Sequence, residues 1–416
     1  MMLPNMHQPA TDLMIDHDFI QHPYPAYDAL LAAGPVHWST QFCGGAWLLP
    51  RYADVIDVLR DPRLSTQRAG RWINGSGPQA RTELREFKRI FSRSLLFLNG
   101  TQHTRLRRVM NAGFKPGALQ ALAPGILRIV DRLCDRFDAM AEAGVEIDFI
   151  RDFARQLPAL VIADMLAIDP ADQSNFVAWS DDIAHFIGSP TPSMEIARQA
   201  QSSLVALNDY FRALLPQRRL HPGDDLISQL IRAEASGGVI TTNELLAQCC
   251  TLLFAGHETT RNLLGNGFFS LLQHPAQLQD LKNNPALMPS ALRELLRFDS
   301  PVQYTGRILT SDIEMHGHRM KKGQLVIALI GAANRDPAKF TDPARLDLAR
   351  NQGNHLSFGY GPHVCIGAQL TYLEAGIALT TLLKRFPAAR LVESAAAWGA
   401  NPLYRGLARL PVRLAA

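Results

Sequence analysis

The 416-residue chain has no hydrophobic run long enough to cross a membrane. A membrane-spanning helix needs roughly 18–20 consecutive apolar residues, and the nearest approach, around residues 252–256, is bracketed by polar side chains. The first twenty residues hold Asp12, Asp16 and Asp18 but no Lys or Arg, so they lack the basic start of a signal peptide. We therefore expect a cytoplasmic protein without membrane association.

Cysteine is also scarce, and its spacing is irregular. An odd count of five, with one adjacent pair and no CxxC, argues against a disulfide framework and favours a reducing compartment. The same spacing excludes a Cys-rich zinc or iron–sulfur site. The five residues are Cys43, Cys134, Cys249, Cys250 and Cys365.

Neither sign of charge dominates. The 42 Lys and Arg residues against 38 Asp and Glu give a net charge of +4, too mild for a protein that binds nucleic acid by neutralising phosphates. Hydrophobic residues make up 47% and charged residues 19%, which excludes global disorder and indicates a large core.

The pattern predicts a mainly α protein with small segregated β-sheets, an α+β class. Residues 101–298 are helical in pattern, whereas residues 302–309, 313–315 and 325–329 read as strands. Short strands are also expected at 36–39, at 46–49 and in the tail 391–414. We expect a single domain over 1–416, with a β-rich N-terminal part of about 1–60 packed on the helical bulk.

The connection from Leu64 to Gly100 is long, polar and without a clear period. Such a segment is often a functional lid, or else a set of short, weakly signalled helices. Both interpretations stay open.

The longest predicted helix runs from Thr242 to about Leu272. It is apolar on nearly all sides and should be buried, yet it carries Gly256-His257-Glu258-Thr259-Thr260 near its middle. A buried acid with hydroxyls costs several kcal/mol unless these groups are satisfied or useful.

A glycine-rich loop from Phe358 to Gly367 leads into a predicted helix over about 366–386, with Cys365 at the helix start. The helix dipole and free N–H groups there favour a thiolate. No second Cys or His lies at metal spacing, which suits one axial protein ligand to a metal held by a macrocycle. A buried structural cysteine is the alternative that the loop alone leaves open.

The pattern F-x-x-G-x-x-x-C-x-G, filled by Phe358, Gly361, Cys365 and Gly367, resembles the haem-binding loop of the cytochrome P450 superfamily. The resemblance covers essentially the whole chain and implies that fold, with a long central helix over haem b (iron protoporphyrin IX). It implies that Cys365 is the proximal metal ligand, whose electron donation favours O–O cleavage, and that Phe358 and Gly367 contact the haem.

The segment Ala255-Gly256-His257-Glu258-Thr259-Thr260 is similar to the family's A-G-x-[D/E]-T-T motif. By this resemblance Ala255 lies against the haem, Gly256 leaves room for dioxygen, and Glu258 and Thr259 are the catalytic pair that delivers protons. A hydroxyl that bonds back to the preceding turn is the alternative for both threonines. We interpret His257 as a helix-facing polar residue and not as a ligand.

Glu294-Leu295-Leu296-Arg297 resembles the family's ExxR motif, whose two charges share a helix face. The implied role is a buried charge network under the haem loop, joined by an arginine from the downstream segment. Arg345 matches that position, and Arg335 is interpreted as local capping or turn support.

His103 and Arg107 stand four residues apart, so that two donors on one helix face could clamp a carboxylate. By resemblance they hold a haem propionate, and Arg307 and His363 match two further propionate contacts. A solvated basic face is the alternative.

The resemblance implies a haem-thiolate monooxygenase that activates dioxygen and oxidises a small, largely apolar molecule. Electrons should come from NAD(P)H through a ferredoxin-type donor and a ferredoxin reductase, with Arg105 or Arg108 near the docking face of a monomer. A peroxide-driven peroxygenase, an oxidative coupling enzyme and a non-catalytic haem sensor are the alternatives. The substrate pocket is expected to be lined from residues 71–97, 176–192, 252–255, 302–305 and 402–403.

Overall fold

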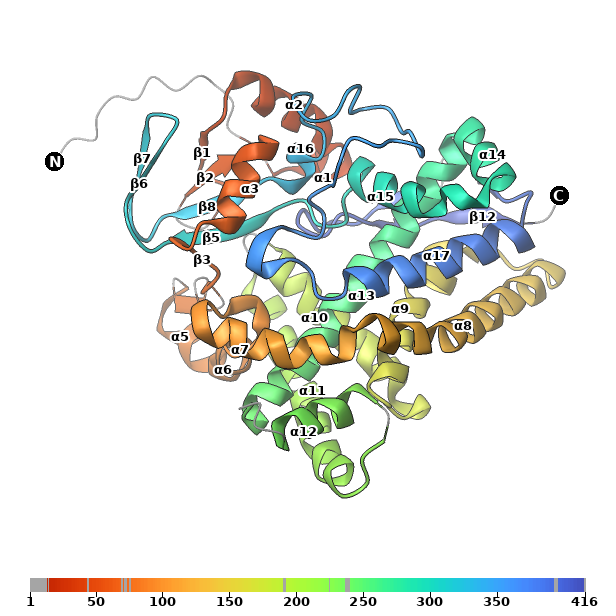
Figure 1. The fold of residues 1–416 in the computed structure, drawn as a ribbon, viewed down its shortest axis with the longest axis horizontal. Helices are drawn as coiled ribbons and strands as arrows, with labels where there is room; N and C mark the ends of the chain where they lie inside the picture. Colours follow the sequence, from red (N-terminus) through yellow and green to blue (C-terminus); the bar gives the residue numbers. More distant parts are fainter. Residues whose placement is uncertain are drawn as a thin grey trace.

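The computed structural model describes residues 13, 15–42, 45–68, 70, 73–74, 76–189, 192–223, 225–235, 240–392 and 396–414. Helices make up most of the molecule, and the main sheet lies at one side of the helical body (Figure 1). The predicted mainly helical class with small separate sheets is confirmed. Of the helices in these ranges, none has the length and apolar character needed to span a bilayer. Cys43, Arg71 and the first twelve residues lie outside the described ranges.

The main sheet draws its strands from both halves of the chain. Their order is β1 (His37–Ser39), β2 (Ala46–Leu49), β8 (Leu325–Ala328), β5 (Thr305–Leu309) and β3 (Leu64–Ser65). The β2–β8 pair is parallel and the others are antiparallel. Arg307 pairs with Val326 in the β5–β8 register. The sheet therefore brings the segment after β3 next to β5, where Arg307 lies.

Short helices and minor strands surround this sheet. Two of the N-terminal helices end at residues that stop helices, one at Gly34 and one just before Pro62. The sequence pattern did not predict β3 or the strands at Ile147–Asp148 and His318–Met320, because two or three residues are too few to show a strand period. These elements are α1 (His17–Gln21), α2 (Pro23–Ala33), α3 (Tyr52–Arg60), α16 (Ile330–Ala333), β6 (Ile313–Met315), β7 (His318–Met320), β4 (Ile147–Asp148), β9 (Arg390–Leu391), β10 (Ala397–Trp398), β11 (Leu407–Arg409) and β12 (Pro411–Arg413).

The connection after β3 contains short helices, which confirms one of its two interpretations. They are α5 (Gly77–Glu83), α6 (Arg85–Phe91) and the 3-10 turn η1 (Leu95–Phe97). Phe87 and Phe91 stack with ring centroids 4.5 Å apart and bury this segment against the helical body. The segment therefore has a fixed inner face, and this face borders the cavities described below.

The helical body consists of long helices that cross one another. It contains α7 (Gly100–Met110), η2 (Asn111–Phe114), α8 (Pro116–Glu142), η3 (Ile150–Ala154), α9 (Gln156–Met165), η4 (Pro170–Asp172), α10 (Gln173–Gly188), α11 (Met194–Leu220), α12 (Leu226–Ala235), α14 (Pro275–Asn283), η5 (Pro285–Leu287), α15 (Met288–Phe298), η6 (Gly361–His363) and α17 (Ala368–Arg385). In Figure 1, α8 and α17 run beside each other along the front of the body.

The central helix α13 (Thr242–Gln273) runs through the molecule as predicted. Its start is fixed by a capping box, in which Thr241 and Glu244 satisfy each other's backbone N–H groups. It is 32 residues long, or about 48 Å at the usual helical rise of about 1.5 Å per residue. Most of its side chains are buried, so its few polar ones need partners inside the protein.

Candidate active site

A cavity of about 300 Å³ lies between α13, the loop before α17 and the main sheet. This volume is within the usual range for a small-molecule site, about 300–1,000 Å³. Nine of the ten predicted catalytic and cofactor-binding residues line its wall: His103, Arg107, Ala255, Glu258, Thr259, Arg307, Phe358, His363 and Cys365. The remaining residue, Gly367, is the N-cap of α17.

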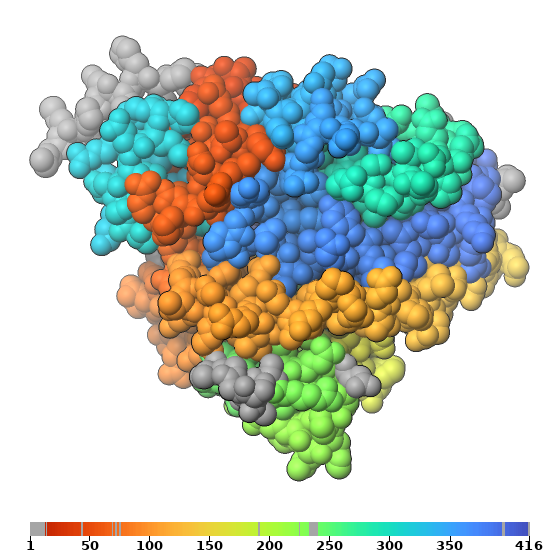
Figure 2. Space-filling view, viewed as in Figure 1, coloured from red at the N-terminus to blue at the C-terminus, as the bar shows by residue number. Residues whose placement is uncertain are grey.

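The loop before α17 holds Cys365 at the cavity wall. The Cys365 N–H donates to the Phe358 carbonyl at 2.8 Å, which closes the loop on itself. Gly359 and Gly361 have φ of 71° and 72°, a region that side chains rarely adopt. A Cβ on Gly361 would lie 3.1 Å from the Leu59 carbonyl oxygen, so the loop also fits closely under α3. In Figure 2 this blue part of the chain lies at the surface, above the orange band of α7.

Burial raises the pKa of the Cys365 thiol, while the N–H groups of Gly367 and Ala368 and the Arg107 guanidinium act in the opposite direction. The side chain is nevertheless exposed at the cavity wall, so its sulfur is accessible to a metal. A metal cation next to the sulfur would supply the missing positive charge, because a coordinating thiol is deprotonated outright. Within the described residues, no group of three or more His, Cys, Asp or Glu could hold a metal ion.

Four basic side chains meet at one end of this cavity. The rings of His103 and His363 lie 4.0 Å apart between centroids, and the His103 Nε2 is buried without a hydrogen-bond partner. Burial lowers the pKa of Arg307 to about 9, and Arg68 acts in the same direction. Burial and the neighbouring His103, Arg307, Arg107 and Arg68 lower the pKa of His363 to about 3.

This arrangement fits the carboxylates of a haem. Basic groups that lower one another's pKa values need an anion to be stable together, and the His103 Nε2 needs a partner. The Arg307 guanidinium donates only to neutral oxygens, 3.2 Å to Thr305 Oγ1 and 2.9 Å to the Gly306 carbonyl. Two propionates would supply both the charge and the acceptors. His103 and Arg107 would hold them from α7, Arg307 from β5 and His363 from η6.

On α13, Thr259 lines the cavity while its hydroxyl donates to the Ala255 carbonyl at 2.9 Å. The back-bonding alternative is therefore realised, and the Thr259 oxygen still has lone pairs that can accept a hydrogen bond. Thr260 lies 3.5 Å from Thr371 between hydroxyl oxygens and does not line the cavity.

Gly256 lies where α13 crosses α9. A Cβ at this position would lie 2.9 Å from Ile162 Cδ1 on α9. The glycine therefore lets the two helices approach closely. The expectation that it leaves room for dioxygen stays a prediction.

Glu258 is held at the edge of the cavity by its own helix. Its carboxylate accepts hydrogen bonds from Arg261 at 3.1 Å and from Asn262 at 3.2 Å. Arg261 also approaches Asp181 of α10 at 4.0 Å, and Asp181 forms an ion pair with Arg155. A chain of charged groups thus leads from the partly exposed Asp181 to the cavity.

His257 points away from the cavity, as predicted. It is fully buried, with Nδ1 3.0 Å from Ser180 Oγ and Nε2 3.0 Å from the Arg155 carbonyl. Burial lowers its pKa, so the ring is a neutral bridge from α13 to α9 and α10.

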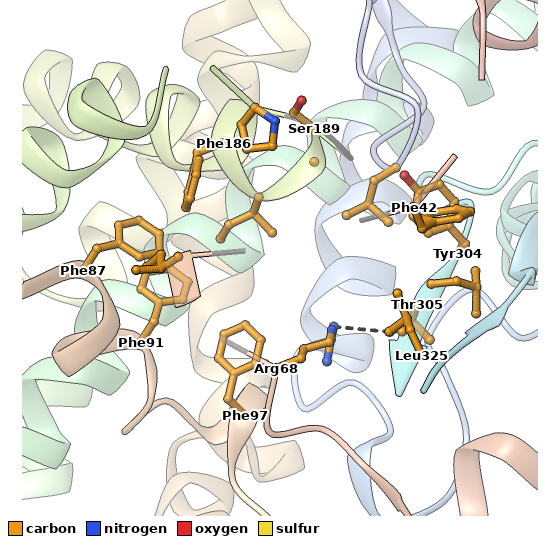
Figure 3. Close-up of a pocket in the computed structure, with 17 residues that line it drawn as sticks. Phe42, Arg68, Phe87, Phe91, Phe97, Phe186, Ser189, Tyr304, Thr305 and Leu325 are labelled. Atoms are coloured by element: carbon orange, nitrogen blue, oxygen red, sulfur yellow. Dashed lines mark hydrogen bonds between the residues drawn. The ribbon is translucent and has the colours of Figure 1, made fainter. Parts of the chain in front are cut away.

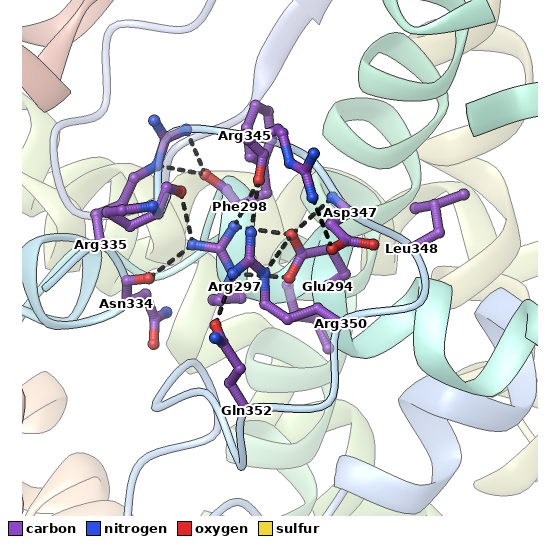
Figure 4. Close-up of polar contacts among 12 residues, drawn as sticks. Glu294, Arg297, Phe298, Asn334, Arg335, Arg345, Asp347, Leu348, Arg350 and Gln352 are labelled. Carbon is purple, nitrogen blue, oxygen red and sulfur yellow. Dashed lines mark hydrogen bonds and ion pairs between the residues drawn. The ribbon is translucent and has the colours of Figure 1, made fainter. Parts of the chain in front are cut away.

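The Glu294–Arg297 pair is buried, and Figure 4 shows the arginines and backbone carbonyls that surround it. Arg297 Nε donates to Glu294 at 2.7 Å. The prediction that Arg345 is the third member of this charge network is wrong. Arg350 takes that place, donating from Nε to Glu294 Oε1 at 3.1 Å with its side chain 6% exposed. Arg345 turns outward to Asp347 and offers only its carbonyl to Arg297 and Arg350.

Arg335 caps a helix, as predicted. Its Nη2 donates to the Phe298 carbonyl at 2.7 Å, at the C-terminus of α15, and its guanidinium lies 3.7 Å from the Tyr24 ring centroid.

A second cavity, of about 220 Å³, adjoins the first and shares Arg68, Phe97, Tyr304 and Thr305 with it. Figure 3 shows phenylalanine rings around this space, with Phe87, Phe91 and Phe186 on one side. The predicted lining ranges include those three residues. They missed Phe42 and Arg68, and also Leu325 and Ile327, because these come from segments that carry no motif.

Comparison with known proteins gives a consistent picture. The sequence model of the family described as Cytochrome P450 matches residues 74–391. The chain is 34% identical over 397 residues to the biotin biosynthesis cytochrome P450 of Bacillus subtilis, covering 95% of this chain and 97% of that protein. It is 35% identical over 411 residues to the cytochrome P450 monooxygenase PikC of Streptomyces venezuelae, covering 97% and 94%. A solved structure of P450BioI in complex with acyl carrier protein ligated to hexadec-9Z-enoic acid is similar with a TM-score of 0.88 and 33% identity, covering 95% of this chain and 100% of that one.

Proposed function

The chain belongs to the cytochrome P450 family, and we propose that Cys365 supplies the protein ligand to its haem iron. The chain is a haem-thiolate monooxygenase, an oxidoreductase that binds haem and dioxygen and oxidises a small molecule. The assignment of Cys365 rests on one observation. A single cavity is lined by both Cys365, from the loop before α17, and Thr259, from α13.

When bound, the haem supplies the site and the oxidising power for dioxygen chemistry that the side chains lack. The residues of the chain orient it. His103, Arg107, Arg307 and His363 line the cavity and would hold the propionates, while Phe358 of the loop and Ala255 of α13 would contact the haem. Gly367 lies beside the sulfur at the start of α17: a Cβ built on it would lie 3.9 Å from Cys365 Sγ, an ordinary van der Waals contact.

Glu258 and Thr259 move protons. The Thr259 hydroxyl keeps acceptor capacity toward the cavity, and Glu258 stands beside it on the same helix with Arg261 and Asn262 as its partners. To carry a proton toward Thr259, the Glu258 carboxyl gives up its hydrogen bond with Arg261 and turns toward the cavity or toward water. An acid and an alcohol so placed are suited to general acid catalysis.

The substrate is small and largely apolar, because the adjoining cavity is lined mainly by phenylalanine and aliphatic side chains.

Electrons come from NAD(P)H through a ferredoxin and its reductase. Of the two predicted docking arginines, Arg108 is exposed, whereas Arg105 is paired with Glu244 at the start of α13. Arg108 is therefore the residue that meets an acidic ferredoxin.

The test uses isotopically labelled dioxygen. A compound chosen by a spectral screen is turned over with NADPH, a ferredoxin, its reductase and ¹⁸O₂. The product should contain one ¹⁸O atom, and a product whose added oxygen is unlabelled, and so comes from water, would contradict monooxygenation. Hydrogen peroxide in place of the reductase system should give much slower turnover, because the Glu258–Thr259 pair serves dioxygen.

A further inference from the structure

Arg68 lies where the two cavities meet, three residues after strand β3. Figure 3 shows its side chain reaching across toward Thr305. Its stem passes over β5, since a Cβ built on Gly306 would lie 3.5 Å from Arg68 Cδ, and its guanidinium carbon lies 5.3 Å from the Phe97 ring centroid. The side chain is thus held by packing between a strand and an aromatic ring.

The guanidinium of Arg68 has weak polar contacts only. Nη1 lies 3.5 Å from the Thr66 carbonyl oxygen and Nη2 3.5 Å from Thr305 Oγ1, both at the outer limit of a hydrogen bond. Across the described part of the chain, no Asp or Glu forms an ion pair with it. An arginine keeps its charge at neutral pH, and a half-buried guanidinium without an acidic partner is suited to binding an anion.

The positive charges around the larger cavity exceed what two haem propionates would balance. Among the residues that the structure describes, three guanidiniums border this cavity: those of Arg68, Arg107 and Arg307. Two propionates balance two of them. The one carboxylate among the described lining residues, Glu258, is already bound to Arg261. One positive charge is left over.

Arg68 is the arginine whose position fits an anion other than a haem propionate. Arg107 and Arg307 border only the larger cavity, whereas Arg68 borders both. Of the described residues that line the smaller cavity, it is the one charged side chain, and the others are phenylalanines, aliphatic residues and small neutral groups. A charge at the edge of an apolar chamber is suited to a ligand with one anionic end and a large apolar body.

We propose that Arg68 is a specificity-determining residue that binds a carboxylate of the substrate, so that the enzyme acts on an apolar organic acid. The proposal rests on the proposed function and narrows its substrate class. The substrate's carboxylate forms charge-assisted hydrogen bonds with the Arg68 guanidinium at the junction, and its apolar part packs on the phenylalanine rings. Thr305 and the Thr66 carbonyl set the plane of the guanidinium.

The experiment compares acids with their uncharged esters. Octanoic, tetradecanoic and 4-phenylbutanoic acids and their methyl esters are titrated calorimetrically into the haem-loaded enzyme at pH 7.5. At least one acid should bind about 10- to 100-fold more tightly than its ester, the usual effect of a charge-assisted hydrogen bond. Arg68→Leu and Arg68→Gln should bring that ratio close to one, and Arg68→Lys should keep part of it. Arg63→Leu, which removes an exposed arginine paired with Asp61, should leave it unchanged.

A second measurement separates the substrate from the haem as the source of the carboxylate. Haem transfer to apomyoglobin should quicken in Arg307→Leu but stay at the wild-type rate in Arg68→Gln. Fast haem loss in Arg68→Gln with an unchanged acid-to-ester ratio would assign Arg68 to a propionate and overturn the proposal. A wild-type enzyme that binds every ester as tightly as its acid would overturn it as well. Calorimetry reads binding and not turnover, so a failure of the monooxygenase assignment would be seen separately.

Discussion

The carboxylate of Glu258 and the guanidinium of Arg261 lie 3.1 Å apart, three residues apart along α13. Both side chains are mostly buried, 11% and 18% exposed, and Arg261 lies between Glu258 and Asp181. This ion pair fixes the position of the Glu258 carboxylate at the edge of the cavity between turnovers. It also gives the acid a route toward solvent, since Asp181 on α10 is 28% exposed.

The first prediction concerns this acid and its neighbour. Glu258→Gln should slow product formation about 100-fold, within the range usual for loss of a general acid. Thr259→Ala should still bind substrate and consume NADPH, but should release the electrons as hydrogen peroxide or water. The ratio of product to NADPH consumed measures both effects. Thr260→Ala is the matched control, because Thr260 does not border the cavity; equal coupling in the Thr259 and Thr260 variants would remove Thr259 from the proton path.

The second prediction separates the two arginines after α16. Arg297→Leu should lower the free energy of unfolding by about 3–5 kcal/mol, because it leaves Glu294 buried without its main partner. Arg350→Leu should cost at least about 2 kcal/mol, as it removes a charged hydrogen bond to Glu294 and bonds to carbonyls of the neighbouring turn. Arg345→Leu should change stability by no more than about 0.5 kcal/mol, as its exposed pairing with Asp347 implies. Unfolding in guanidinium chloride gives all three values, and a larger loss for Arg345 than for Arg350 would contradict the geometry.

The third prediction is a pH dependence that arises from His355. Its Nδ1 accepts a hydrogen bond from the Ser357 N–H at 3.1 Å, and its Nε2 lies 3.0 Å from the Tyr372 hydroxyl, so the folded protein holds the ring neutral. Burial, with Arg293 and Arg297 nearby, lowers the pKa of His355 to about 3. The unfolded chain binds this proton near pH 6.5, so stability is lost as the pH falls from about 6.5 toward 3.

His355→Gln should therefore flatten the profile. Between pH 6.5 and pH 5 the wild type should lose up to about 2 kcal/mol more unfolding free energy than the variant, since one proton contributes at most about 1.4 kcal/mol per pH unit. Denaturant titrations at several pH values measure the difference. The exposed His221→Gln should follow the wild type, and parallel profiles for His355→Gln and the wild type would contradict the assignment.

The fourth prediction concerns electron delivery. Arg108→Ala should slow the first electron transfer from an acidic ferredoxin by up to about fivefold at low ionic strength, the size of one exposed charge pair. The effect should fade as salt is added, because screening weakens steering between exposed charges. Arg105→Ala should have a smaller effect, since Glu244 already balances its charge. Stopped-flow reduction rates provide the comparison, and an Arg108 variant as fast as the wild type at low salt would place the docking face elsewhere.

Much of the fold was predictable because its signals are local. The start and end of α13 follow from a capping pattern and a long apolar sequence, and the loop with Cys365 follows from closely spaced glycines. The structure brings the motif residues of α7, α13, β5 and this loop together at one cavity. Their chemical roles remain predictions that the variants above examine.

What the sequence could not predict depends on packing between distant segments. Arg350 turns inward, where its guanidinium also donates to the carbonyl of Asp342, and no spacing rule distinguishes it from Arg345. Gly256 faces Ile162 because α13 crosses α9, a contact between residues almost a hundred positions apart. Arg68 reaches the junction of the cavities through the β3–β5 pairing, and it belongs to no motif.

The central claim is that Cys365 ligates the haem iron, and the absorption spectrum of the ferrous protein with carbon monoxide tests it most directly. The wild type should give the red-shifted Soret band of thiolate ligation. Cys365→Ser should lose that band, whereas Cys134→Ser, which changes a buried free cysteine on α8, should keep it. A Cys365→Ser protein that binds haem and retains the red-shifted band would contradict the account.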